Sequence, residues 1–435
     1  MTVRDLYTDI YPNLLLDFAN VKALDPRVTF ARASSAVVVD PTGVYREVTS
    51  NVPRFDHDPV TGESLGLLIE EQRTNSIRNP RGEGAVAGTP GTTPTNWAVQ
   101  TVSGVLTTVV GFGTEDGISY VDIRYAGTNS GSTGFPTIFF ESIGGIAASA
   151  SQVWSGSLYA RLIAGALPTS VTFSAWELDV SNAYLRNTSF SAPSFTPTTA
   201  ALKTQRVLAG SGTTGANTTS IRPLIAVTVN SGQAVDFTLR IGWLQLELGA
   251  FATSPILPPV GSPAQSTRAA DAANMTGTNF SSWYRHDQGT FVIESRWFIV
   301  QPAVPISYSF LANKAPGGST TTGGIGIWNW SGNDNFNGYI FNDSGVIQFS
   351  PGITPAESGS TLTTMTKQAL AYRVNDAVIA ANGFVDTTDT SVTLPTNLTT
   401  LNIGFASSSF TSQYVKRLIY YPARLTTTEL QAISR

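Results

Sequence analysis

The sequence predicts an all-β protein, with a small amino-terminal unit, two antiparallel β-sandwiches and one short helix at the carboxyl end. Three observations support this prediction. Charged residues make up only 13% of the 435 residues, while 39 Gly and 24 Pro provide many turn positions. Apolar runs of strand length recur along the chain between turn residues. Where apolar and polar residues alternate, the period is two, which is typical of strands with one buried face.

Residues 1–80 form the first predicted unit. Short apolar runs at 14–18 and 36–39 have the length of strands, and Pro and Gly occupy turn positions in 40–43 and 58–62. The unit is too small and irregular to build a core of its own, so we expect it to pack against a neighbour.

Residues 81–92 are rich in glycine and predict a connecting loop. Residues 93–254 follow as the first predicted sandwich. Alternation is clear at 155–162 and at 236–248, and turns recur every 8 to 15 residues. Period-two strands separated by frequent turns predict a β-sandwich.

Residues 255–270 are rich in proline and predict a linker between domains. Residues 271–435 form the second predicted sandwich, with alternating strands at its beginning (289–298) and near its end (414–425). Thr426 and Glu429 have the spacing of a capping box before Leu430, which predicts a short closing helix.

The composition excludes several classes of function. The net charge is −4 and Lys and Arg never cluster, so we expect no binding to nucleic acid. No apolar run reaches the length of a membrane span, and the first residues lack the pattern of a signal peptide. The chain has no cysteine, which removes disulfides, zinc-thiolate sites and cysteine nucleophiles. We therefore expect synthesis in the cytoplasm, without membrane insertion.

Catalytic side chains are scarce. The two histidines, His57 and His286, are expected to be turn or surface residues rather than parts of a catalytic site. Glu177 and Asp179 share one face of a strand near Trp176, and two carboxylates across a sugar bond would suit a glycoside hydrolase. Carboxylates that simply face solvent are the favoured interpretation, so we assign no catalytic residue. A polysaccharide-degrading activity remains the alternative.

Aromatic residues among short polar ones favour carbohydrate binding, because sugars stack on aromatic rings and form hydrogen bonds with amides and carboxylates. The segment 325–339 is the richest in such residues. Trp328 and Trp330 would either form an exposed stacking shelf or point into the core, where large aromatics usually lie. The predicted glycan-binding residues are Trp97, Trp176, Tyr184, Trp328, Trp330, Asn333, Asp334, Asn335 and Tyr339.

Side-chain oxygens in the glycine-rich turns of the second sandwich raise the question of a metal. Together with Asn342 and Asp343, the residues Asn333, Asp334 and Asn335 could supply oxygen ligands to Ca²⁺. Their spacing matches no calcium loop, and hydrogen-bonded turns explain them equally well. We therefore assign no metal or cofactor, with Ca²⁺ as the alternative.

Three stretches resemble known families. The segment 51–75, with Phe30, Arg32 and Ser34 upstream, resembles an amino-terminal module of phage, prophage and gene-transfer-agent spike or fibre proteins. The stretches 94–97 and 243–255 resemble jelly-roll carbohydrate-binding modules. The stretches 289–298 and 414–431 resemble concanavalin-A-like or laminin-G-like sandwiches.

The resemblance implies a head spike or tail fibre on the surface of a virion or phage-like particle, without enzymatic activity. It implies attachment to host capsular polysaccharide or lipopolysaccharide through the sandwiches, and to other virion proteins through residues 1–80. A homo-oligomer, trimer or pentamer, is expected. A purely structural spacer is a further alternative.

Overall fold

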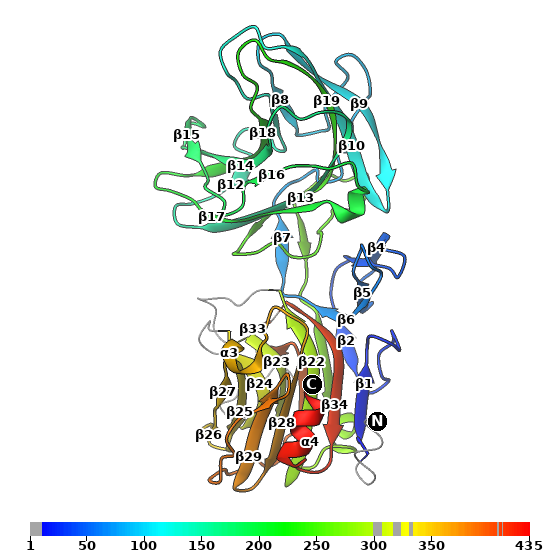
Figure 1. The fold of residues 1–435 in the computed structure, drawn as a ribbon, viewed down its shortest axis with the longest axis vertical. Coiled ribbons are helices and arrows are strands. Elements are labelled where there is room, and N and C mark those ends of the chain that lie inside the picture. Colours follow the sequence, from blue (N-terminus) through cyan, green and yellow to red (C-terminus); the bar gives the residue numbers. More distant parts are fainter. Residues whose placement is uncertain (1–10, 299–306, 316–322, 330–333, 407–408, 411) are drawn as a thin grey trace.

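The computed structural model describes residues 11–298, 307–315, 323–329, 334–406, 409–410 and 412–435. It confirms the predicted fold class: the chain is all-β, with antiparallel sheets packed as sandwiches and a short carboxyl-terminal helix. Figure 1 shows one sandwich above the other, with a narrow waist between them. In the described parts, no helix is long and apolar enough to cross a membrane.

The middle sandwich consists of two sheets of described strands. The first has the order β17 (Arg206–Thr213), β13 (Val153–Gly165), β19 (Ala234–Leu248), β10 (Ile118–Thr128) and β9 (Val105–Glu115). The second has the order β15 (Tyr184–Asn187), β14 (Val171–Leu178), β18 (Ser220–Val227), β11 (Thr137–Phe139) and β8 (Ala98–Gln100). The short strands β12 (Ile146–Ala147) and β16 (Ser194–Phe195) pair with β18 and β14. One apolar core lies between the two sheets.

The carboxyl-terminal sandwich is larger. One sheet has the order β30 (Phe384–Val385), β29 (Asp376–Ala381), β28 (Thr366–Arg373), β22 (Gln288–Trp297), β34 (Gln413–Tyr421), β6 (Ser64–Ile69) and β5 (Arg54–His57), and β1 (Leu14–Asp17) also pairs with β34. The other has the order β2 (Thr29–Ala31), β21 (Ala272–Thr276), β31 (Thr400–Ile403), β23 (Ser307–Asn313), β24 (Gly324–Asn329), β25 (Phe336–Phe341) and β26 (Ile347–Phe349), and β27 (Gly352–Ile353) pairs with β25. Their facing side chains form the largest apolar cluster.

Residues 11–75 are built into this second sandwich. They supply β1, β5 and β6 to one of its sheets and β2 to the other. The run at 65–69 lies in β6, whose residues Leu67 to Ile69 pair with the beginning of β34 and are fully buried. The structure thus joins residues that the sequence analysis placed in separate units. Pairing between strands that lie far apart in the chain leaves no local pattern.

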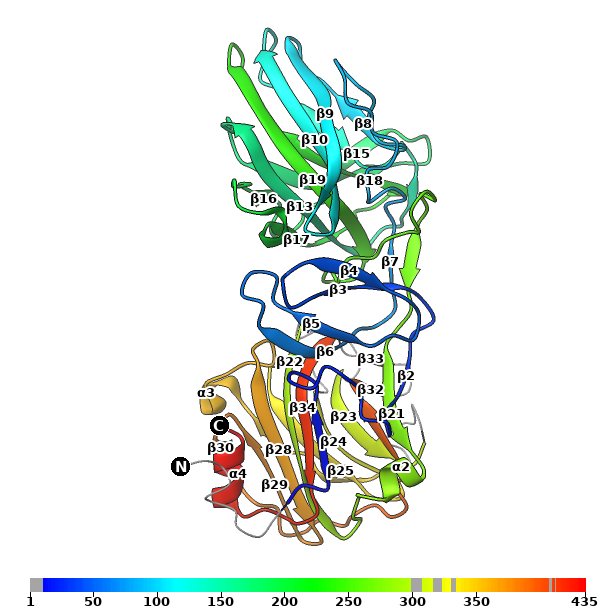
Figure 2. The same ribbon diagram turned by 90° about the vertical axis from the view of Figure 1, so that its right-hand side faces the viewer.

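The hairpin of β3 (Ala36–Val39) and β4 (Tyr45–Val48) lies between the two sandwiches, as Figure 2 shows. The apolar side of this hairpin packs against the base of the middle sandwich. The ring of Tyr45 lies 5.4 Å from that of Tyr159 and 5.5 Å from that of Trp243, centroid to centroid. The hairpin therefore ties the lower sandwich to the upper one.

The middle sandwich is inserted between two strands that pair with each other. β7 (Arg73–Asn75) enters it and β20 (Ser266–Arg268) leaves it, and the two form an antiparallel ribbon. The segment predicted as a linker is packed here: Ile256 and Leu257 are buried. Both connections of the middle sandwich thus run side by side through the waist.

The remaining described elements are short: the ribbon of β32 (Phe405–Ala406) and β33 (Ser409–Phe410), the 3-10 turn η1 (Leu202–Thr204), and the helices α2 (Thr278–Ser281), α3 (Pro355–Ser358) and α4 (Thr427–Ile433). The predicted capping box of the closing helix is present. Thr426 Oγ1 accepts a hydrogen bond from Glu429 N, while the Glu429 carboxylate accepts one from Thr426 N.

Candidate functional site

A hollow on the outer face of the seven-stranded sheet combines the features of a carbohydrate site. Along β14, Val171, Phe173 and Ala175 belong to the core of the middle sandwich. Because side chains alternate along a strand, Thr172 and Trp176 point to the opposite, outer face. The antiparallel register places Thr172 opposite Ala226 of β18.

This hollow, which we call the sheet-face groove, has a volume of about 490 Å³. That volume lies within the range of about 300–1,000 Å³ that is common for ligand pockets. It is lined by Gln100, Phe135, Thr137, Thr172, Phe173, Ser174, Trp176, Asn187, Thr188, Ser189, Phe190, Pro193, Leu224, Ala226 and Thr228. The lining is uncharged, and it combines aromatic rings with amides and hydroxyls.

Trp176 is the half-buried aromatic centre of the groove. Its ring lies 4.6 Å from that of Phe139, at 70°, and 5.1 Å from that of Tyr184, at 63°. The guanidinium of Arg222 lies over the Phe139 ring, 3.8 Å from its centre, and so covers one face of that ring. Tyr184, 51% exposed, stands beside Trp176 at the surface. The structure thus brings together two of the residues predicted from the sequence.

Several polar groups in the groove are available to a ligand. Among the described residues, none forms a hydrogen bond with the side chains of Gln100, Thr172, Ser174, Trp176 or Asn187. Two amides, two hydroxyls and an indole N–H can therefore bind sugar hydroxyls without breaking an internal bond. Sequence reasoning missed Asn187, which lies opposite Trp176 only when β15 pairs with β14, and Gln100, which reaches the groove only when β8 joins the far side of the sheet.

The carboxylates considered for catalysis have other partners. Glu177 is buried and accepts hydrogen bonds from Thr218 Oγ1 (2.6 Å), Arg186 Nη1 (2.8 Å) and Gly215 N (2.9 Å). Burial raises the pKa of Glu177, but these hydrogen bonds outweigh it, so its pKa lies below the usual value. Asp179 accepts from the backbone of Ser181 and stabilises a turn. The two carboxylates do not face a common space in the groove.

The predicted shelf in the second sandwich is covered. Trp328 is 1% exposed, and its ring stacks on Tyr339 at 4.3 Å and on Phe341 at 5.6 Å. These rings form a cluster with Tyr308 that is separate from the main core. Trp328 and Tyr339 are therefore buried, and they do not form the exposed stacking shelf that was the other interpretation. Strand alternation indicates a face, but not whether that face is covered.

The other predicted residues have different surroundings. Trp97 is buried, donates Nε1–H to Asn79 O and lies against Phe140 in the core. Asp334 accepts a hydrogen bond from Leu362 N, and the Asn335 carbonyl accepts one from Asn329 Nδ2. Trp330 and Asn333 lie outside the described residues. No second aromatic site of the predicted kind is assembled from these side chains in the part of the chain that the structure describes.

The oxygens considered for Ca²⁺ take part in turns and ion pairs. Asn342 Oδ1 accepts from Ser344 N and Val346 N, both at 3.0 Å. Asp343 pairs with Lys314 at 2.8 Å and also accepts from Thr396. Among the described residues, no group of three or more His, Asp or Glu side chains could hold a metal ion.

A buried cluster of charges lies at the waist, and sequence reasoning did not find it. We call it the waist cluster: Arg32, Arg54, Glu70, Arg268 and Asp271, with side chains at most 1% exposed. Glu70 Oε2 contacts Arg54 at 2.7 Å and Arg268 at 3.1 Å, while Asp271 contacts both Arg32 and Arg54. Removing one partner from such a buried cluster leaves an uncompensated charge, which is strongly destabilising.

The waist cluster connects two parts of the chain that lie far apart in the sequence. Arg32, Arg54 and Glu70 come from the first unit, while Arg268 and Asp271 follow the inserted sandwich. Burial raises the pKa of Glu70, but Arg268 and Arg54 outweigh it and lower this pKa to about 2. Arg54 and Glu70, both in the segment 51–75, therefore help to fix the waist.

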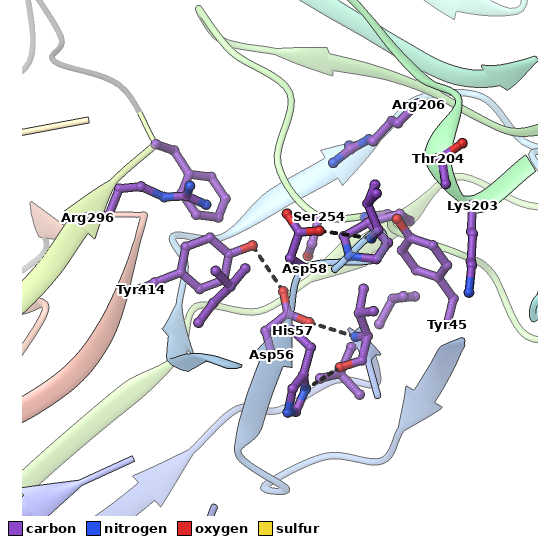
Figure 3. Close-up of a pocket in the computed structure, with 18 residues that line it drawn as sticks. Tyr45, Asp56, His57, Asp58, Lys203, Thr204, Arg206, Ser254, Arg296 and Tyr414 are labelled. Atoms are coloured by element: carbon purple, nitrogen blue, oxygen red, sulfur yellow. Dashed lines mark hydrogen bonds between the residues drawn. The ribbon is translucent and has the colours of Figure 1, made fainter. Parts of the chain in front are cut away.

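Figure 3 shows a small pocket beside the waist cluster. Asp56 accepts hydrogen bonds from Val39 N at 2.6 Å and Tyr414 Oη at 3.0 Å, and burial raises its pKa to about 6. His57 is buried, not a surface residue as expected, and its Nδ1 lies 2.9 Å from Val39 O. These groups fasten the β3–β4 hairpin to the lower sandwich. His286 is exposed, as expected.

No protein-family model and no curated protein matches this chain. Solved structures with distant similarity to it include the following three. Domain 4 of a GH43 extracellular arabinanase from Geobacillus stearothermophilus, in complex with arabinotriose, is 10% identical with a TM-score of 0.29, over 42% of this chain and 82% of that one. The Ruminococcus gnavus IT-sialidase CBM40, bound to α2,6 sialyllactose, is 14% identical with a TM-score of 0.27, over 36% and 88%.

The tandem CBM22 domains of Paenibacillus barcinonensis Xyn10C are 10% identical to this chain, with a TM-score of 0.24, and the match covers 81% of this chain and 95% of that one. All three similarities are too distant to assign a family. The functional interpretation therefore rests on the residues of this chain.

Proposed function

We propose that this protein is a non-catalytic, glycan-binding attachment component of a phage-like particle, either a head spike or a tail fibre. The sheet-face groove is the observation that supports glycan binding. Its half-exposed Trp176 offers a flat apolar surface for a sugar ring, and the surrounding amides and hydroxyls suit sugar hydroxyls. Its lining is uncharged, which favours the neutral sugars of a host polysaccharide.

The proposed role at the particle follows from the resemblance of residues 51–75, and the waist would hold the upper sandwich in place on the lower one. A single open groove binds a sugar weakly, and several copies on one particle raise the overall affinity without new contacts. A trimer or pentamer with closed symmetry would supply those copies. The first unit and the carboxyl-terminal sandwich would together contact the other virion proteins.

Substitution of Trp176 by Ala tests the groove. We expect binding to capsular polysaccharide or lipopolysaccharide of the host to weaken by about tenfold or more, since stacking and an N–H donor are both lost. The measurement is binding of the purified protein to immobilised polysaccharide. Phe112→Ala is the matched control, because Phe112 is a 57% exposed aromatic on the opposite sheet.

Unchanged binding by Trp176→Ala would contradict the groove as the glycan site. Absence of binding by the unmodified protein to any host polysaccharide would instead favour the spacer. Incubation of the same polysaccharide with the protein, followed by sizing of the chains, tests the enzymatic alternative. We expect the chains to keep their length.

A further inference from the structure

A second cavity, distinct from the sheet-face groove, lies between the two sandwiches. It has a volume of about 580 Å³, and we call it the inter-sandwich cleft. Its upper wall comes from β13, β17 and the segment 250–252, and its lower wall from the ends of β22 and β34. It shares Arg206, Arg296, Phe298 and Tyr414 with the smaller pocket of Figure 3.

The charge of the inter-sandwich cleft has one sign. Of the described residues that line it, only Arg206 and Arg296 are charged. They come from different sandwiches, and Figure 3 shows their guanidinium groups directed toward each other across the waist. The Asp58 carboxylate of the adjoining pocket lies near Arg296 but does not line this cleft, so the cleft itself presents two guanidinium groups, which attract an anion.

The N–H donors of the Arg296 guanidinium are available to a ligand. Its guanidinium carbon lies 5.0 Å from the centre of the Tyr414 ring, and Phe298 lies beside the same ring. Among the described residues, no carboxylate or carbonyl oxygen accepts a hydrogen bond from Arg296. The rings thus hold the planar group in place while its N–H donors remain free.

Arg206 faces Arg296 from the other wall. Its Nη2 donates to Ser157 Oγ at 3.1 Å and to Thr253 O, which fixes the side chain. Its Nε is buried without a hydrogen-bond partner. A buried N–H without a partner is destabilising, so an acceptor beside Arg206 would be favoured.

The uncharged lining indicates which kind of anion fits. Three aromatic rings add apolar surface to the lining: Phe251, which has Arg73 over one face, and Phe298 and Tyr414, which lie against each other. Ser191, Ser211 and Thr363 add hydroxyls. A simple inorganic anion would not use the rings or fill the volume, whereas a sugar acid has a carboxylate, hydroxyls and an apolar ring face.

We propose that the inter-sandwich cleft binds the carboxylate of an acidic saccharide, of the uronic acid type, with Arg296 as the main anion-binding residue and Arg206 opposite it. The ligand contacts both sandwiches and bridges the waist. This proposal is independent of the sheet-face groove, which has an uncharged lining.

The test is calorimetric titration of the full chain with trigalacturonate, and with maltotriose as the neutral sugar of equal length. We expect trigalacturonate to bind and its affinity to fall as salt is raised, because ion pairs are screened. Arg296→Gln should weaken binding by about tenfold or more, since charge-assisted hydrogen bonds are lost, and Arg296→Lys should retain part of the affinity. Thermal melting of each variant verifies that it is folded.

Arg124→Gln is the matched control, because Arg124 is a surface arginine of the middle sandwich that pairs with Asp236. This variant should bind like the unmodified protein, and so should Trp176→Ala. Equal affinity in folded Arg296→Gln would overturn the proposal. So would no binding at about 10 mM trigalacturonate, loss of that binding in Trp176→Ala, or binding of maltotriose to Trp176→Ala as tight as that of trigalacturonate.

Discussion

Asp56 connects the protonation state of one carboxyl group to the stability of the waist. Its oxygens accept hydrogen bonds from Val39 N and Tyr414 Oη, and it is only 5% exposed. Burial raises the pKa of Asp56 more than these hydrogen bonds lower it, so the pKa rises from 3.8 to about 6. An acid with a raised pKa in the folded state contributes stability below its unfolded pKa, and this contribution is lost as pH rises through the folded pKa.

Asp56→Asn removes this pH dependence. Between about pH 4.5 and about pH 7.5, the free energy of unfolding of the unmodified protein should fall relative to the variant, by about 2 kcal/mol. Urea denaturation of both proteins at the two pH values gives the difference. Other titrating groups, such as Glu70, are common to both proteins and largely cancel. A difference that is independent of pH, or that grows in the opposite direction, would contradict the raised pKa.

Single residues also show what the sequence could and could not predict. Trp176 and Tyr184 are predicted as binding residues from residue type and local context, because an aromatic among small polar residues is a local signal. The pairing of Arg32 with Asp271 spans 239 positions, and no local pattern records it. Trp328 has the same local signal as Trp176, yet its ring is stacked under others, since burial is decided by the packing of distant strands.

Among the elements, β6 shows how closely the first unit fits the second sandwich. Gly66 lies where β6 meets β34, with a φ of +88°. A Cβ atom there would collide with the backbone oxygen of Val415. The glycine is therefore required both by its left-handed conformation and by the close approach of the strands.

Gly66→Ala should lower the free energy of unfolding by about 3 kcal/mol or more, because strain and a backbone clash add. The matched control is Gly277→Ala, at a φ of +57° with no atom within 4 Å of the added carbon. The control should cost only about 1 kcal/mol from the conformation alone. Equal losses in denaturant titrations of the two variants would mean that β6 and β34 are not in close contact.

The sequence predicted the positions of single strands and of the closing helix better than it predicted the site. Alternation located the strands around 153–165 and 234–248, and the capping box located α4, because these signals are local. Alternation does not say which strands are neighbours. The assignment of β1, β2, β5 and β6 to the distant sandwich therefore needed the structure.

Considered as a whole, the molecule has two bodies: an inserted sandwich, and a base made from both ends of the described chain. Asn75 of β7 pairs with Ser266 of β20, so the two connections are adjacent. A short turn can therefore replace everything between them. The base keeps both its sheets and its core when this is done.

We expect a chain in which a Gly-Ser turn replaces residues 77–264 to fold cooperatively, although less stably. It loses the contact of Ser254 with Glu70 and uncovers Tyr45. A chain of residues 265–435 alone lacks β1, β2, β5 and β6 and should not unfold cooperatively. Thermal unfolding followed by circular dichroism compares the two, and a cooperative transition in the second chain would show that the first unit is dispensable.

The ribbon of β7 and β20 has an evolutionary consequence. A domain whose entry and exit lie side by side can be exchanged by recombination at one place, and its host domain need not change. A lineage that carries this base can acquire a different upper sandwich in one genetic event, which under the proposed function would also change the sugar specificity. The base would then stay the same while different upper sandwiches replaced one another.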